Sequence, residues 1–247
     1  MKGIRHTKIY IAAFFIFAAV TITILCYIAD IKNEYKEAYD VPVLKTENIP
    51  GANADKLMIV AHPDDELLWG GGHLMDGNYL VVCVTRGYDK VRSAEFEKVV
   101  TESGNEPLIL FYPDKVAGKR DDWGRVSRKI TDDLTTVMEY KDWELIVTHN
   151  KDGEYGHQHH KMVHQYVTDI YENKKLSSDL YFFGKYYKKS KLADVENQLE
   201  KLDDERLRFK ENLAPYYASQ QKTVDKLWHA AEYEMWEKYD SGSESDI

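Results

Sequence analysis

The chain has 247 residues, a formal net charge of −9 and two cysteines. The acidic balance, without a stripe of basic and aromatic residues, argues against a nucleic-acid partner. No C-x-x-C motif occurs, and neither cysteine lies in a segment placed to bond the other, so a thiolate zinc site and a disulfide are not expected.

An uncharged apolar segment, residues 9–29, comes first in the chain. As a helix it would be about 31 Å long, which matches the hydrocarbon core of a bilayer. Lys2, Arg5 and Lys8 precede it, so the positive-inside bias predicts a single-pass membrane protein with a cytoplasmic N-terminus and an extracytoplasmic domain. A cleaved signal peptide is the competing interpretation, but its apolar region would usually be shorter and no clear cleavage motif follows. We therefore expect an uncleaved signal anchor within residues 1–30.

A linker is predicted next, over residues 31–54. This segment mixes charges with Pro42 and Pro50 and shows no sustained periodicity. It would let a following domain stand away from the bilayer.

One domain, residues 55–240, is predicted after the linker. Apolar β-rich segments alternate with helical periodicity, which indicates a Rossmann-like α/β fold: a mostly parallel sheet with helices on both faces. The predicted strands are 57–61, 79–84, 108–111, 145–148 and 180–183, and the predicted helices centre on 95–103, 126–140 and 160–171. Charged helical segments are expected over 192–209 and 223–239, and the acidic tail 241–247 is expected to be disordered.

The motif Ala-His-Pro-Asp-Asp-Glu, residues 61–66, follows the first predicted strand. Ligands bind at this end of the sheet in α/β folds, and Pro63 ends the strand there. A histidine and an aspartate belong to the ligand set of a catalytic zinc site, and a second carboxylate can serve as general base. An ordinary surface turn is the alternative, because Pro-Asp-Asp is also turn sequence.

A histidine cluster follows the predicted strand 145–148. Residues 153–160 read Gly-Glu-Tyr-Gly-His-Gln-His-His and open a segment with helical periodicity. His157 and His160 are three residues apart, so they share one face at the start of a helix. Seven of the nine histidines lie between His62 and His164, which isolated core histidines explain poorly. The two motifs together predict a metal held by histidine and carboxylate.

These motifs resemble those of the LmbE-like, or PIG-L, de-N-acetylases. The resemblance covers roughly residues 56–220 and rests on the motif at residues 61–66 and on Gly-His-x-x-His, each after a strand. Further matching residues are Gly71, Gly72, Thr85, Gly87, Arg92, Glu95, Tyr155 and the sequence Tyr-Ala-Ser-Gln at 217–220.

The resemblance implies a zinc-dependent N-acetylglucosaminyl deacetylase, with another divalent metal such as Fe²⁺ as an alternative. The implied metal ligands are His62, Asp65 and His160. The implied catalytic residues are Asp64 as general base, His157 at the oxyanion or the departing amine, and Tyr155 at the same oxyanion. Arg92 is expected to bind sugar hydroxyls, or else to form an ion pair with Glu95 at the start of its helix.

The chain departs from the family pattern at His159, where relatives commonly carry an aspartate beside the metal ligand. A carboxylate there would raise the pKa of His157, whereas an imidazole would not, so the tuning of His157 stays open. His149, His164 and His73 are expected in packing or surface roles, because a fourth protein ligand would close the metal site.

The expected substrate is an N-acetylglucosamine-type amino sugar in a glycan or glycoconjugate, one of the cell envelope if the domain faces outward. Aromatic residues in or beside predicted loops are candidates for stacking on sugar rings, with packing in the core or at its rim as the alternative: Tyr112, Trp123, Tyr186 and Tyr187. Two alternatives stay open, a metal-dependent amidase acting on another amide conjugate and a non-catalytic anchored binding module. The sequence does not indicate an oligomeric state.

Overall fold

The computed structural model describes residues 2–240, with side chains from residue 16 onward. Within it the chain divides into two compact units. One unit extends to Val41 and includes Lys115–Asp121, and the other comprises Pro42–Asp114 and the chain from Asp122 onward. The expected disordered tail, residues 241–247, lies outside the described residues.

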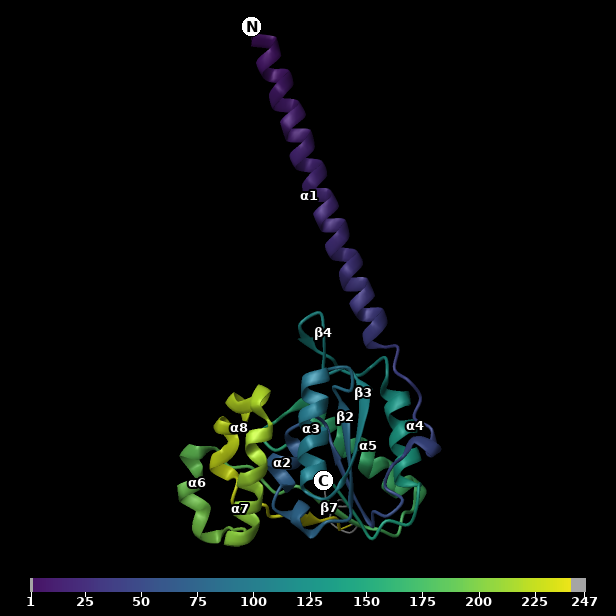
Figure 1. Ribbon diagram of the computed structural model, residues 1–247, viewed down its shortest axis with the longest axis vertical. Coiled ribbons are helices and arrows are strands. Elements are labelled where there is room, and N and C mark those ends of the chain that lie inside the picture. Colours follow the sequence, from purple (N-terminus) through teal and green to yellow (C-terminus); the bar gives the residue numbers. More distant parts are fainter. Residues whose placement is uncertain (1, 241–247) are drawn as a thin grey trace. The chain divides into compact units, whose positions relative to one another are not determined.

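The first unit consists of a long helix and a short hairpin (Figure 1). Helix α1, Lys2–Ala38, extends beyond both ends of the predicted span 9–29. Its segment Ile16–Ala38 has a mean hydropathy of 1.5 and no buried residues, and it is long and apolar enough to cross a membrane. A signal sequence would meet the same criteria, so membrane anchoring stays a prediction.

The hairpin of the first unit is formed by strands β4 (Lys115–Val116) and β5 (Lys119–Arg120). The N–H of Ala117 at its turn donates to Glu34 of α1 at 2.6 Å. Tyr39 OH donates a short hydrogen bond to Asp121, which ties the far side of the hairpin to the segment after α1.

The second unit is built on a six-stranded sheet in the order β3-β2-β1-β6-β7-β8. Its strands are β1 (Lys56–Val60), β2 (Tyr79–Thr85), β3 (Glu106–Tyr112), β6 (Leu145–Thr148), β7 (Asp179–Phe182) and β8 (Glu237–Lys238). Within this sheet, β3, β2, β1, β6 and β7 pair in parallel with their neighbours, whereas β8 is antiparallel to β7. The predicted Rossmann-like α/β class is confirmed.

Both faces of this sheet are covered by helices. Met58 and Val60 pack with Phe96 of α3 and with Leu227 of α8, while the alternating residue Ile59 is equally buried on the opposite face. Figure 1 shows α3 on one side of the sheet and α5 on the other. The helices are α2 (Asp65–Gly70), α3 (Lys90–Glu102), α4 (Ser127–Met138), α5 (Gln158–Lys174), α6 (Lys189–Val195), α7 (Asp204–Leu213) and α8 (Gln221–Leu227). Burial on both faces explains why the central strands are continuous apolar runs.

The C-terminal part contains shorter helices than the two predicted over 192–209 and 223–239, with irregular segments between them. Helix α8 ends at Leu227, and the end of the second predicted helix is instead β8, which pairs with β7 at the edge of the sheet. Trp236 therefore packs from an irregular segment: its Nε1 donates to the carbonyl of Trp69 at 3.1 Å, and its ring stacks on His73 at 3.8 Å. Pairing at the sheet edge satisfies backbone groups that the helix would otherwise satisfy.

Part of the predicted linker is ordered against the second unit. Ile49 is buried, Leu44 N–H donates to Asp133 at 3.1 Å, and Gly51 N–H donates to Glu106 at 3.3 Å. The chain is thus in contact with the sheet domain well before β1 begins.

Candidate active site and metal centre

The candidate site lies where the strand order of the sheet reverses. Strand β1 is flanked by β2 on one side and β6 on the other, and the later strands continue outward from each. Ligands bind at the carboxyl ends of the strands at such a point in an open α/β sheet. His149, directly after β6, joins the two loops there, because its Nε2 accepts the N–H of Ala61 at 2.9 Å.

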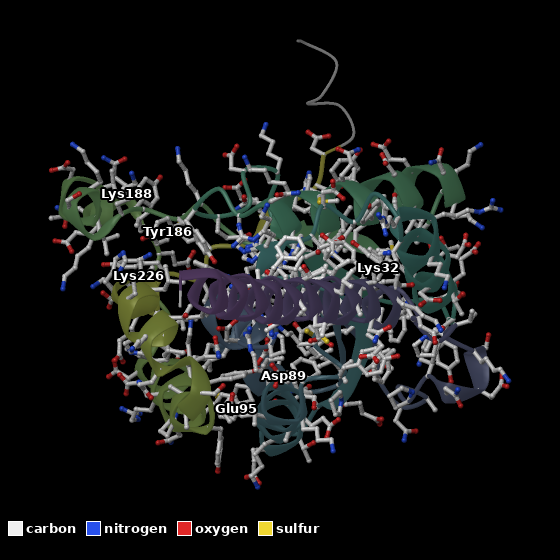
Figure 2. The ribbon with its side chains drawn as sticks, turned by 90° about the horizontal axis from the view of Figure 1, so that it is seen from above. Lys32, Asp89, Glu95, Tyr186, Lys188 and Lys226 are labelled. Atoms are coloured by element: carbon white, nitrogen blue, oxygen red, sulfur yellow. The ribbon has the colours of Figure 1, made fainter. Side chains whose placement is uncertain are left out.

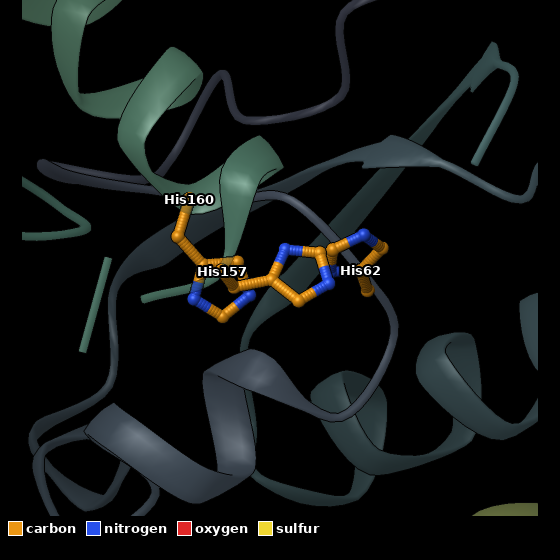
Figure 3. Close-up of side chains that lie close together, drawn as sticks. All are labelled: His62, His157 and His160. Carbon is orange, nitrogen blue, oxygen red and sulfur yellow. The ribbon is translucent and has the colours of Figure 1, made fainter. Parts of the chain in front are cut away.

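The three predicted metal ligands meet at this point. His62 comes from the loop after β1, Asp65 begins α2, and His160 lies in the first turn of α5. All three are buried. His62 Nδ1 lies 3.2 Å from one carboxylate oxygen of Asp65, and His160 Nε2 lies 3.2 Å from the other. Figure 3 shows the rings of His62 and His160 with His157 beside them.

The donor set at this point fits a divalent cation. His160 Nε2 is buried and forms no hydrogen bond with any residue that the structure describes, although a carboxylate lies close by. An imidazole nitrogen that faces a carboxylate without bonding to it is the arrangement that a metal ion would complete. The residues present therefore fit the predicted metal.

His160 is supported by two buried residues, Glu154 and His149. Neither was predicted from the sequence to act at the metal. Glu154 accepts a short hydrogen bond from His160 Nδ1 and lies 3.1 Å from His149 Nδ1, which fixes the proton of His160 on Nδ1. Burial alone would lower the pKa of His160, but Asp65 and Glu154 raise it to about 10. Burial would raise the pKa of Glu154, but His149 and His160 hold it at about 2. Glu154 adjoins Tyr155 in the motif, but its burial is not visible in the sequence.

Asp64, the predicted general base, has a strained backbone. Its φ of 107° lies in a region that residues other than glycine rarely adopt. Its N–H donates to Glu66 at 3.2 Å, and its Oδ1 lies 3.4 Å from Arg92 Nη2. Burial, and then the charge of Asp65, raise the pKa of Asp64 well above its ordinary value. A buried carboxyl group with a raised pKa is suited to accepting a proton.

Arg92 is buried against the loop that carries Asp64. It donates a short hydrogen bond to the carbonyl of Pro63 and pairs with Asp64 rather than with Glu95. Glu95 instead accepts from the N–H and Oγ of Ser219 at 2.7 and 2.5 Å. The Arg92 Nε atom is buried and has no hydrogen-bond partner among the described residues. Binding of sugar hydroxyls by Arg92 stays a prediction.

Glu66 and Tyr217 form a buried pair beneath the same loop. The Tyr217 OH donates a short hydrogen bond to Glu66, and burial raises the pKa of Glu66 to about 8. Tyr217 opens the C-terminal Tyr-Ala-Ser-Gln sequence. This distant motif therefore supports Asp64 through Glu66, whose other oxygen accepts the Asp64 N–H.

His157 lies beside the metal ligands. Its ring centroid is 4.6 Å from that of His62 and 4.4 Å from that of His160 (Figure 3). His157 caps α5, because its Nδ1 accepts the N–H of His159 at 3.2 Å. An accepting Nδ1 places the proton of the neutral ring on Nε2, so His157 can donate a hydrogen bond. Tyr155, 44% exposed, lies with its ring 5.9 Å from that of His157.

The aromatic residues predicted to stack on sugar divide into two groups. Tyr112 and Trp123 are fully buried, so neither presents a ring face to a ligand. Tyr186, on the segment between β7 and α6, has its ring 6.0 Å from that of Tyr155. Figure 2 shows Tyr186 near Lys188 of the same segment. Tyr187 is partly buried, with Lys185 Nζ 5.5 Å from its ring centroid. Tyr186 is thus the member of this set that lies beside the exposed Tyr155.

Three overlapping groups of buried side chains can hold a metal ion. They are His62, His157 and His160; His62, Asp114 and His159; and Asp65, His149 and His160. Asp114 follows β3 at the same edge of the sheet, a position that could have identified it from the sequence. Because the groups share His62 and His160, they describe one centre with several neighbouring donors.

Part of the chain is similar to a known protein family. Residues 57–171 match the family model described as GlcNAc-PI de-N-acetylase, PIG-L. The uncharacterized protein L374 of Acanthamoeba polyphaga mimivirus is 31% identical over 134 residues, which cover 47% of this chain and 58% of that protein. The match thus spans little more than half of that curated relative.

Solved structures align with this chain at low sequence identity. The A40926 pseudoaglycone deacetylase Dbv21 aligns with a TM-score of 0.55 and 17% identity, over 70% of this chain and 85% of that one. The N,N'-diacetylchitobiose deacetylase from Pyrococcus horikoshii aligns with a TM-score of 0.46 and 16% identity, over 78% and 86%. The hydratase GalB of Pseudomonas putida aligns with a TM-score of 0.45 and 15% identity, over 78% and 99%.

Residues 57–171, which contain both motifs at the carboxyl edge of the sheet, are thus similar to the PIG-L de-N-acetylase family model. The fold of the chain is similar to that of Dbv21.

Proposed function

We propose that this protein is a membrane-anchored, metal-dependent hydrolase that removes the acetyl group from an N-acetylglucosamine-type amino sugar in a glycan or glycoconjugate. The proposal rests on one observation above all: His62, Asp65 and His160 meet in a buried cluster beside Asp64. The cluster lies within residues 57–171, and the similarity of this segment to the de-N-acetylase family model supports acetyl transfer to water as the reaction.

The proposed cofactor is Zn²⁺, with Fe²⁺ as the alternative, held by His62, Asp65 and His160. A divalent metal at such a site supplies Lewis acidity toward the acetyl carbonyl and makes water a stronger nucleophile at neutral pH. Glu154 supports this role, because its hydrogen bond to His160 Nδ1 orients the opposite ring nitrogen toward Asp65.

The neighbouring residues divide the proton transfers. Asp64 would take the proton of the attacking water, since its pKa is raised and Arg92 holds its carboxylate in place. His157, with its proton on Nε2, would stabilise the oxyanion by a hydrogen bond, and Asp64 would pass the proton taken from water to the departing amine. The exposed Tyr155 would add a second hydrogen bond to the oxyanion.

The proposed location is the outer face of a membrane. The apolar segment of α1 and the basic residues that precede it support an anchor with the domain outside the cytoplasm. An outward domain would encounter glycans of the cell envelope or exported glycans. Tyr155 and Tyr186 are positioned to contact a sugar ring near the site.

The test combines metal analysis of the purified protein with amine release from a panel of N-acetylglucosamine compounds. We expect about one divalent ion per chain and amine release from at least one member, with Asp64→Asn as the inactive control. Release from other amides but from no N-acetyl sugar would replace the proposal with an amidase. Absence of both metal and amine release would leave the non-catalytic binding module.

A further inference from the structure

His159 faces a metal ligand rather than the catalytic imidazole. Its Nδ1 lies 3.1 Å from His62 Nε2. The rings of His159 and His157 are 5.6 Å apart and tilted by 59°, and His157 Nδ1 already accepts the backbone N–H of His159. The side chain at this position is therefore directed toward His62, not toward His157.

Trp123 holds His159 in this orientation. Its indole stacks on the imidazole with centroids 4.1 Å apart and an interplanar angle of 5°. The indole Nε1 donates to the carbonyl of Pro113 at 2.7 Å, and Trp123 itself has a φ of 56°, which is unusual for a bulky residue. A stack this close and this well anchored opposes rotation of the His159 ring.

Asp114, next to Pro113, presents a carboxylate to the same pair of rings. Its Oδ1 lies 3.6 Å from His62 Nε2 and 3.7 Å from His159 Nδ1. Its Oδ2 accepts from Arg86, through Nε at 3.1 Å and through Nη2 in a short hydrogen bond. Arg86 thus fixes the carboxylate, and the Oδ1 of Asp114 faces both imidazole rings.

We propose that His159 is a positioning residue for the metal ligand His62: its Nδ1 accepts the proton on His62 Nε2, so that His62 Nδ1 is presented to the metal beside Asp65. The inference rests on the proposed metal centre. A metal-binding imidazole that donates its other N–H to a fixed acceptor is held in one tautomer and one orientation and is a stronger ligand. His159 then serves the first histidine of the site instead of tuning His157.

A second cation between His62, Asp114 and His159 is the competing interpretation, since these atoms lie close enough to hold one. Two observations oppose it. The Arg86 guanidinium already neutralises Asp114, and His62 would have to lose both ring protons to bind two metals. The hydrogen-bonded arrangement is therefore favoured.

The test measures Zn²⁺ affinity of the full chain in detergent by competition with a chromogenic chelator. His159→Phe keeps an aromatic ring against Trp123 and removes the acceptor, so affinity should fall about 10- to 100-fold. His159→Asn keeps an acceptor near the position of Nδ1 and should recover most of that loss. His229→Phe is the control: the ring nitrogens of His229 lie 3.1 Å from the carbonyls of Lys226 and Tyr187, and it contacts no proposed ligand among the described residues, so affinity should not change.

A second measurement avoids substitution. Nitrogen-15 spectra of the histidine rings in the zinc-loaded wild-type protein should show His62 bound through Nδ1 with a proton on Nε2. Metal on Nε2 would overturn the proposal even if the His159 variants failed to fold.

Other outcomes of these measurements would distinguish the proposal from an action of His159 on His157, from a second cation site and from failure of the proposed function. Unchanged affinity in His159→Phe, with a shifted pH profile of turnover, would mean that His159 acts on His157 and would overturn the proposal. Two Zn²⁺ per wild-type chain, falling to one in His159→Phe, would overturn it in favour of the second cation. A wild-type protein that binds zinc as expected but deacetylates nothing refutes only the proposed function, whereas one that binds no zinc refutes both.

Discussion

Replacing Lys210 by methionine should destabilise the second unit by about 3–5 kcal/mol, the usual cost of leaving one member of a buried ion pair alone. Lys210 is 0% exposed, and its Nζ donates to Glu234 at 2.5 Å and to the carbonyls of Leu68 and Ala231 at 2.9 Å each. Methionine has a similar volume, so little of the loss comes from packing. The cost arises because Glu234 keeps a buried charge without its cation and two carbonyls lose their donor.

Urea unfolding followed by circular dichroism measures this cost, with Lys201→Met as the matched control. Lys201 pairs with Glu232 at 3.0 Å, but its side chain is 50% exposed, so its replacement should cost no more than about 1 kcal/mol. The double variant Lys210→Met/Glu234→Gln should be less destabilised than the sum of the single changes, because no unpaired charge remains. Equal costs for Lys210 and Lys201, or full additivity in the double variant, would refute the reasoning.

The same pair predicts a dependence on acid. Burial would raise the pKa of Glu234, but Lys210 and His73 lower it below the ordinary value of 4.5. A carboxyl group with a depressed folded pKa contributes stability above its unfolded pKa and loses it as the pH falls through its folded pKa. The wild-type protein should therefore lose more stability than Glu234→Gln as the pH is lowered from about 4.5, and parallel acid curves would contradict this.

The other predictions concern the metal, the base and the anchor. His62→Ala and His160→Ala should each lose most of the bound metal by elemental analysis, since two protein ligands rarely hold zinc, and full occupancy in both would remove these residues from the site. Asp64→Asn should keep its metal while turnover falls by about 10²- to 10⁴-fold, whereas Asp65→Asn should lose metal first; the reverse pattern would exchange their roles. A chain that begins at Pro42 should be soluble and active in amine-release assays, and protease added to intact cells should reach the domain of the full chain; protection until lysis would reverse the proposed orientation.

Local features of the sequence were sufficient for the fold class and for the motifs at the site. The strand before His62 and the strand before His149 are apolar runs, and buried parallel strands have that pattern in any context. The predicted strand bounds differ from the observed ones by no more than two residues, as in 108–111 against Glu106–Tyr112. The predicted helix over 223–239 was wrong at its end because that end depends on a distant contact. Strand β8 forms there because β7 offers an unpaired edge, which helical periodicity in the sequence cannot reveal.

The residues that surround the proposed ligands were less accessible to sequence reasoning. His149 was expected in a packing or surface role, yet it is buried between Ala61, Asp65 and Glu154. Its role depends on β6 lying beside β1, a long-range pairing that no local pattern specifies. Trp123 was a candidate both for stacking on sugar and for packing, and it packs: its buried ring stacks on His159.

The C-terminal part of the chain holds the helix that carries a proposed metal ligand. Lys210 donates to the carbonyl of Leu68 in α2, the helix that begins at Asp65, and Tyr217 donates to Glu66 in the same helix. The charged helical sequence of this part does not reveal these buried contacts, which fix the element that carries a proposed ligand. Loss of Lys210 should consequently weaken zinc binding as well as stability. Zinc affinity that is unchanged in a folded Lys210→Met protein would show that α2 holds its position without the C-terminal part.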